Sequence, residues 1–148
     1  MATVIRTSIA LTNPWYISKH RYLELKHFCF QYPEWRKERL EIESRIAGGF
    51  AGERIVGGDR SSSVERHQEQ ANQYEIKMSL VEKAAVEAGD DLWPWLLKGV
   101  TKECGYEYLH MTEGIPCCKD VYYRMYRKFF WVLSREKNKL LYEDQNIT

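Results

Sequence analysis

The chain has 148 residues, of which 44% are hydrophobic and 14% are aromatic. That length fits one domain, or one core with an extended appendage, and the apolar content excludes global disorder. The net charge is +1, but residues 1–60 hold 10 Lys/Arg against 7 Asp/Glu, residues 61–118 hold 5 against 10, and residues 119–148 hold 7 against 4. Positive charge is therefore concentrated at the two ends of the chain. The distribution of charge says more about which partners the protein can bind than the net charge does.

The start of the chain is expected to be an N-terminal tail over residues 1–15. It has no long apolar run after a basic start, and no stretch of the chain reaches the roughly 20 apolar residues that a membrane-spanning helix needs. We therefore expect no membrane partner and a cytoplasmic location. The cysteines form no CxxC pair and match no zinc template, so we expect reduced thiols and no metal site. They are Cys29, Cys104, Cys117 and Cys118.

Residues 16–46 are predicted to form a helical hairpin. Ser18 is a suitable N-cap, and Tyr22 and Leu25 begin an apolar stripe at helical spacing. Pro33 lacks an amide donor and disfavours helix in the residue before it, so the first helix should end near residue 32 and the proline should open the second.

Residues 47–63 are predicted to be a Gly/Ser-rich linker or loop, since they hold five of the nine glycines of the chain. Glycine loses the most backbone entropy on ordering, which favours a hinge. Phe50, Ile55 and Val56 are unusually apolar for a free linker. The alternative, a loop that becomes ordered when it binds a partner, is therefore kept.

Residues 64–141 are predicted to hold one long helix followed by shorter ones. The heptad spacing over residues 64–88 indicates a single helix that ends at Gly89. Its apolar seam could pack in the protein's own core, or on the same helix of a second subunit in a homodimer. The seam consists of Val64, Ala71, Tyr74, Met78, Val81 and Ala85.

The C-terminal third is predicted to be helical as well. We expect a short helix at residues 92–97, another around 106–112, a turn at 113–116, a last helix from residue 117 or 118 to 141, and a tail over 142–148. No segment shows the alternating pattern of a strand. The predicted fold is all-α, a helical bundle with a long central helix and a C-terminal helix-turn-helix.

The last helix should carry a function, because it is apolar on one side and basic on the other. On a helical wheel Tyr122, Met125 and Phe129 fall on the apolar side. A helix with one packed face and one basic face suits the DNA major groove, where arginine and lysine meet phosphates and guanine edges. The predicted DNA-binding residues are Lys119, Tyr123, Arg124, Arg127 and Lys128.

The segment before this helix strengthens the interpretation. A short helix, a turn with Gly114 and an apolar residue at Ile115 are the skeleton of a helix-turn-helix. Two positions depart from the usual pattern: His110 stands where a small residue is usual, and Val121 lies one place late.

Several segments together resemble a known family. Residues 22–26, 32–35, 77–82, 114–117 and 122–133 are similar in layout to prophage-encoded transcriptional regulators of the RinA and ArpU type, from phages of gut Firmicutes. The resemblance implies DNA binding through the C-terminal helix-turn-helix, location in a bacterial host cell, and possible contact with host RNA polymerase.

No enzyme class emerges from the sequence, because the histidines and carboxylates match no nucleophile, acid–base or phosphate-binding pattern. We expect a protein with no cofactor that binds double-stranded DNA as a phage regulator. The alternative is a phage protein that inhibits a host defence complex, such as a CRISPR nuclease, by protein–protein contact. The net negative charge of residues 61–118 would suit such an inhibitor. A small terminase subunit is a third option.

Overall fold

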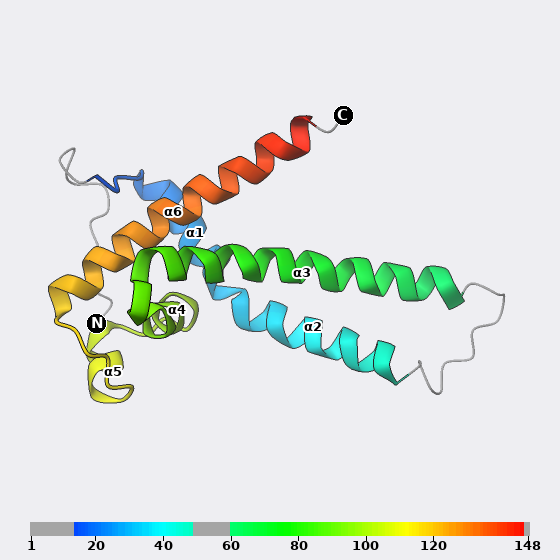
Figure 1. The fold of residues 1–148 in the computed structure, drawn as a ribbon, viewed down its shortest axis with the longest axis horizontal. Coiled ribbons are helices and arrows are strands. Elements are labelled where there is room, and N and C mark those ends of the chain that lie inside the picture. The colour runs from blue at the N-terminus through cyan, green and yellow to red at the C-terminus, as the bar shows by residue number, and fades with distance from the viewer. Residues whose placement is uncertain (1–13, 49–59, 147–148) are drawn as a thin grey trace. The chain divides into compact units, whose positions relative to one another are not determined.

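A computed structural model describes residues 14–48 and 60–146, with the side chains of residues 60–62 and 144–146 left out. Every regular element in these ranges is helical, which confirms the all-α class for the described part of the chain. None of its helices is both long and apolar enough to cross a membrane. Most of the predicted tail 1–15 and linker 47–63 lies outside the described residues. The helices are α1 (Lys19–Phe30), α2 (Tyr32–Ala47), α3 (Arg60–Gly89), the 3-10 helix η1 (Asp90–Leu92), α4 (Trp93–Thr101), α5 (Tyr106–Met111) and α6 (Lys119–Asn146) (Figure 1).

The break between α1 and α2 lies where the sequence predicts it. Ser18 caps α1, since its side chain accepts a hydrogen bond from the backbone N–H of Arg21 at 3.2 Å. The helix ends at Phe30, and Gln31 forms a turn before α2 begins at Tyr32. Pro33 then occupies the first turn of α2, where its missing N–H costs no helical hydrogen bond.

The helices divide into two compact units. Unit 1 runs up to Gln31 and from Leu80 onward, and unit 2 comprises Tyr32–Ser79. The predicted hairpin 16–46 is therefore split, with α1 in unit 1 and α2 in unit 2. The apolar stripe of α1 packs against α6. The Tyr22 and Tyr126 hydroxyl oxygens are 2.9 Å apart, and the Tyr22 ring meets the Phe130 ring edge-on, with 5.0 Å between the ring centres.

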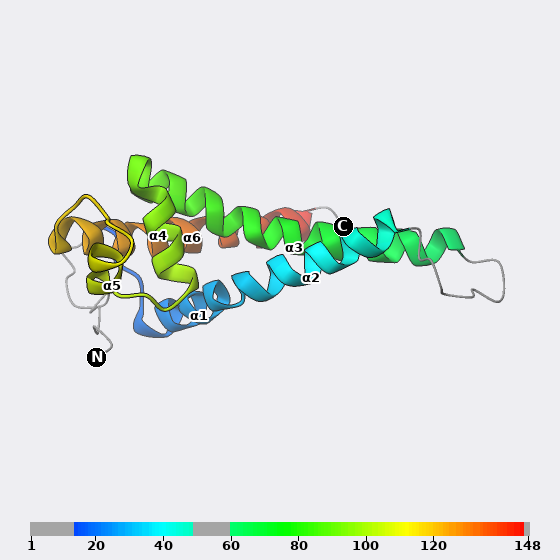
Figure 2. The ribbon, with the colours of Figure 1, turned by 90° about the horizontal axis from the view of Figure 1, so that it is seen from below.

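Within unit 1, α1 packs on α6, and α4 contacts both of them as well as α5 (Figure 2). Gly99 permits this packing, because a Cβ added there would lie 2.1 Å from the Tyr122 hydroxyl oxygen and one of the two groups would have to shift. The α4 backbone can thus approach the α6 side chains closely. The fully buried core of the unit includes Leu25, Leu96, Leu109, Phe129, Phe130 and Leu133.

Unit 2 consists of α2 and the first two-thirds of α3. Trp35 and Ile42 of α2 are buried, and so are Ala71 and Met78 of α3. The ammonium of Lys77 lies 5.7 Å from the centre of the Trp35 ring, a cation–π contact between the two helices.

Most of the heptad seam of α3 is covered within a single chain. Ala71, Met78, Val81 and Ala85 are buried without any second subunit, while Val64 and Tyr74 are half-buried. A dimer along this seam would have to displace the residues that cover it. The burial therefore favours the seam as part of the protein's own core.

The last helix is longer than predicted at its C-terminal end. It starts at Lys119 and continues to Asn146, so the expected tail over 142–148 is helical as far as residue 146. No glycine or proline occurs after Pro116, which leaves the sequence without a residue that would end the helix earlier.

Candidate nucleic-acid interface

The turn before α6 is built around one glycine. Gly114 has a φ of +68°, in the left-handed region that glycine adopts without steric cost. The chain reverses there, and the N–H of Ile115 donates a hydrogen bond to the carbonyl of Leu109 at 3.1 Å. Ile115 is buried as a result. The pairing of Gly114 with an apolar Ile115 thus closes α5 and directs the chain towards α6.

The connection between α5 and α6 has more residues than the turn of a typical helix-turn-helix. α5 has six residues and ends at Met111, and α6 begins at Lys119, so residues 112–118 separate them. The usual turn has three or four residues. His110 is exposed and lies beside the Tyr106 ring at 5.5 Å. A small residue is therefore not required at this position, and a compact helix-turn-helix is not reproduced.

One side of α6 packs in the core of unit 1, in agreement with the helical wheel. Tyr122, Phe129, Val132 and Leu133 are almost completely inaccessible to solvent, and Phe130 joins them. Burial raises the pKa of the Tyr122 and Tyr126 hydroxyls above the usual value for tyrosine. This side anchors the helix and leaves the other available.

The other side of the first half of α6 carries all five predicted DNA-binding residues. Lys119 and Arg124 are exposed, whereas Tyr123, Arg127 and Lys128 are half-buried. In the part of the chain that the structure describes, none of these four cations forms a hydrogen bond or an ion pair. Their charges are therefore not neutralised within the protein.

The second half of α6 differs, because its cations are paired. Arg135 donates to both carboxylate oxygens of Glu87, at 2.7 and 2.8 Å, and also contacts Glu136. Lys139 lies 3.3 Å from the Glu136 carboxylate. Asp120 is the only carboxylate of the helix before Glu136. Free positive charge on α6 is therefore concentrated in its first half, and at the first turn, where Lys119 lies, the helix dipole also favours anions.

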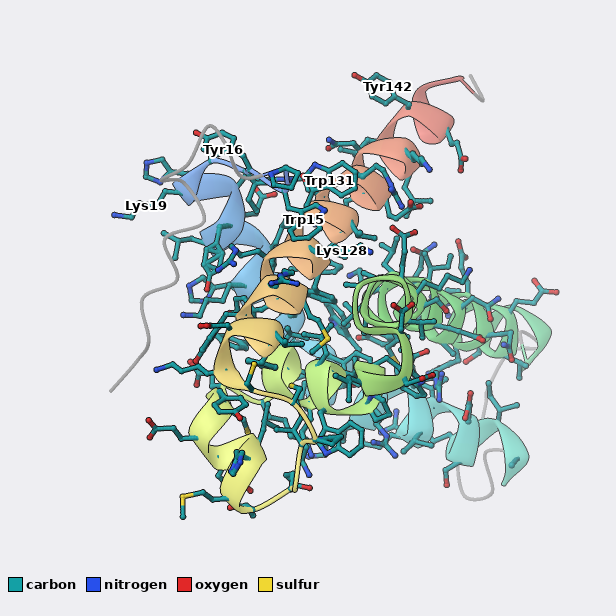
Figure 3. The ribbon with its side chains drawn as sticks, turned by 60° about the vertical axis from the view of Figure 1, so that its left-hand side comes forward. Trp15, Tyr16, Lys19, Lys128, Trp131 and Tyr142 are labelled. Atoms are coloured by element: carbon teal, nitrogen blue, oxygen red, sulfur yellow. The ribbon has the colours of Figure 1, made fainter. Side chains whose placement is uncertain are left out.

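Trp131 extends this surface beyond the predicted residues. It follows Arg124 and Arg127 by seven and four residues, so it lies on the same side of the helix. In Figure 3 it is seen on α6 near Lys128. Sequence analysis missed Trp131, because an aromatic residue on the basic side of a helix breaks the simple division into an apolar and a charged face.

The cysteines show no reactive cluster. All four are free. Burial raises the pKa of the Cys29 thiol far above its usual value, which makes it a packing residue. No group of three metal-binding side chains occurs among the described residues.

No protein-family model, curated protein or solved structure matches the chain.

Proposed function

We propose that this protein is a phage or prophage DNA-binding regulator that contacts double-stranded DNA through the first half of α6. The observation that carries the proposal is the set of four cations, Lys119, Arg124, Arg127 and Lys128, which form no ion pair in the described structure. They project from a helix whose opposite side is held in a core. Such a helix can present several cations to phosphates at little entropic cost.

The residue types suit distinct roles. Arg124 and Arg127 can bind phosphates or the guanine edge through their planar guanidinium groups, while Lys119 and Lys128 suit phosphates as point charges. Tyr123 supplies a hydroxyl between them. Transcriptional control, with host RNA polymerase as a further partner in the bacterial cytoplasm, is what the resemblance to RinA- and ArpU-type regulators adds to this proposal.

Charge reversal tests the interface. The Arg124→Glu/Arg127→Glu variant should lose duplex binding, because it removes two phosphate contacts and adds two repulsive charges. The wild-type affinity should fall by about 100-fold between 50 and 200 mM salt, if about four phosphates are neutralised. Fluorescence anisotropy with labelled duplex fragments at several salt concentrations measures both effects.

The matched control is Lys83→Glu/Lys102→Glu. These lysines are exposed on unit 1, lie outside α6 and form no ion pair in the described structure, and the variant changes the net charge by the same amount. If both double variants weaken binding equally, only net charge matters and the interface is wrong. If the folded wild-type protein binds no duplex at low salt, the proposed function is wrong.

A second candidate function is inhibition of a host defence nuclease by protein–protein contact. It is favoured by α5, which exposes Met111 to 86% and Tyr108 to 47%, one helical turn apart. Methionine and tyrosine are enriched at protein interfaces. A Met111→Glu variant should abolish inhibition in a nuclease cleavage assay, whereas Arg124→Glu/Arg127→Glu should spare it. The reverse pattern would rule out this candidate.

A further inference from the structure

One acidic side chain lies within the basic face of α6. Asp120 is exposed and belongs to the first turn of the helix. Arg124 and Arg127 follow it by four and seven residues, so all three lie on the same side of the helix. Every other carboxylate of α6 comes at Glu136 or later. The proposed DNA interface therefore contains a single negative charge, at the end where the helix begins.

The carboxylate of Asp120 is not neutralised by the cations beside it. Lys119 precedes it directly and Arg124 lies one turn further along, yet the Asp120 side chain forms no ion pair or hydrogen bond within residues 14–48 and 60–146. Glu136, in the second half of the same helix, differs, because it pairs with both Arg135 and Lys139. The Asp120 carboxylate and the Arg124 guanidinium are thus both free to contact a ligand.

A free carboxylate at this position weakens the binding of DNA through its backbone. Phosphates border the groove whatever the base sequence, and each of them repels Asp120. The helix dipole favours an acidic residue in the first turn, but that interaction stabilises the helix and contributes nothing to DNA binding. Asp120 therefore favours binding only where the DNA presents a hydrogen-bond donor to it.

The donors that a duplex exposes in its major groove are the amino groups of cytosine and adenine. The adenine N6 amino group lies next to the acceptor N7, which repels a carboxylate, whereas the cytosine N4 amino group has no acceptor beside it on its own base. Aspartate accordingly pairs with cytosine N4. Since the first residues of a groove-binding helix are those that reach the base edges, Asp120 has both the chemistry and the position for this contact.

Arg124 complements Asp120 in the same part of the helix. The Cβ atoms of residues four apart on a helix are separated by about 5–6 Å, and successive base pairs by about 3.4 Å. The two side chains can therefore contact one base pair or two neighbouring ones. Arginine donates to O6 and N7 of guanine, the partner of cytosine, so Asp120 and Arg124 together complement the donor and the acceptors of a C·G pair.

We propose that Asp120 is a specificity-determining residue, which selects a C·G base pair through the cytosine N4 amino group while Arg124 contacts a guanine beside it. This inference rests on the proposed function. It adds that the preferred ligand is a duplex with a fixed C·G pair at the position of Asp120, and not duplex DNA of any sequence.

The test selects duplexes from a randomised library with the full chain and sequences the bound fraction. The sites that the wild-type protein enriches should share a C·G pair at one position. Replacing it by a T·A pair, which presents an acceptor in place of the amino group, should weaken binding about tenfold. Asp120→Ala should lose this preference and bind unrelated duplexes at least as tightly as the wild type, because a repulsive charge is removed. Asp120→Asn should shift the preference from cytosine to adenine, since an asparagine amide pairs with adenine N6 and N7.

The matched control is Glu107→Ala. Glu107 is an exposed carboxylate in the first turn of α5, so its removal changes the net charge by the same amount and also takes an acidic group from the start of a helix. This variant should enrich the same sites as the wild type. If the wild type binds duplexes without sequence preference, if its preference survives in Asp120→Ala, or if Glu107→Ala alters the preference equally, the role of Asp120 is wrong while duplex binding stands. If the folded wild-type protein binds no duplex at low salt, the proposed function is wrong and the inference falls with it.

Discussion

At the residue scale, the contact between Gly99 and Tyr122 sets the distance between α4 and α6. The Tyr122 hydroxyl is buried and has no hydrogen-bond partner among the described residues. An orphan buried hydroxyl costs about 1–3 kcal/mol, so Tyr122→Phe should raise the free energy of unfolding by about 1 kcal/mol, as measured by urea denaturation. A decrease would show that a water molecule satisfies the hydroxyl.

The same hydroxyl explains why position 99 is glycine. Alanine is favoured over glycine inside a helix by about 1 kcal/mol, yet its Cβ would lie 2.1 Å from the Tyr122 oxygen. Gly99→Ala should therefore destabilise the wild-type protein by about 1–3 kcal/mol and cost clearly less in the Tyr122→Phe background. A double-mutant cycle measures this coupling, and strictly additive effects would contradict it.

At the element scale, the turn between α5 and α6 requires glycine at position 114 because of its backbone conformation, and not because a side chain would clash there. A Cβ at Gly114 would meet nothing within 4 Å, but its φ of +68° strains any L-residue. Gly114→Ala should lower the unfolding free energy by about 1 kcal/mol, because the left-handed region costs about that much. Chemical denaturation monitored by circular dichroism measures the loss.

Gly105 supplies the matched control for this turn. It also has open space around its Cβ position, but its φ of −78° is accessible to every residue. In Gly105→Ala the loss of a good N-cap and the lower entropy of the unfolded chain should roughly cancel. Equal losses at the two positions would mean that the conformation of Gly114 is not what matters.

At the scale of the whole molecule, buried tyrosines should make the fold sensitive to alkali. Burial raises the pKa of Tyr22, Tyr122 and Tyr126 above the value near 10 that they regain on unfolding. The unfolded chain therefore releases these protons first. Their contribution to stability is complete below pH 10 and is lost as the pH rises beyond it, by up to about 1.4 kcal/mol per pH unit for each group.

Tyr126→Phe tests this dependence, because it removes one of the three groups. The unfolding free energy, measured by urea denaturation across pH 8–11.5, should fall less steeply above pH 10 in this variant, whatever its stability at neutral pH. Tyr108→Phe, at an exposed position of α5, should leave the slope unchanged. Identical slopes for all three proteins would show that ionisation of Tyr126 does not contribute.

The sequence by itself determined the local features of this protein. Pro33 separated two helices, the absence of strand patterns indicated an all-α fold, and the spacing of apolar residues identified the buried side of α6. These features follow from interactions over a few residues, which helical periodicity and proline chemistry encode directly. The C-terminal end of α6 was misjudged, because no residue marks it.

Only the tertiary structure decided which elements pack together and which charges remain free. Arg124 and Arg135 look alike in the sequence, yet Arg135 is neutralised by Glu87, 48 residues away, and Arg124 is not. In the same way, α1 packs on α6, where the Tyr22 hydroxyl meets that of Tyr126, 104 residues later in the chain. Such contacts depend on how the chain folds back on itself, and no local spacing records them.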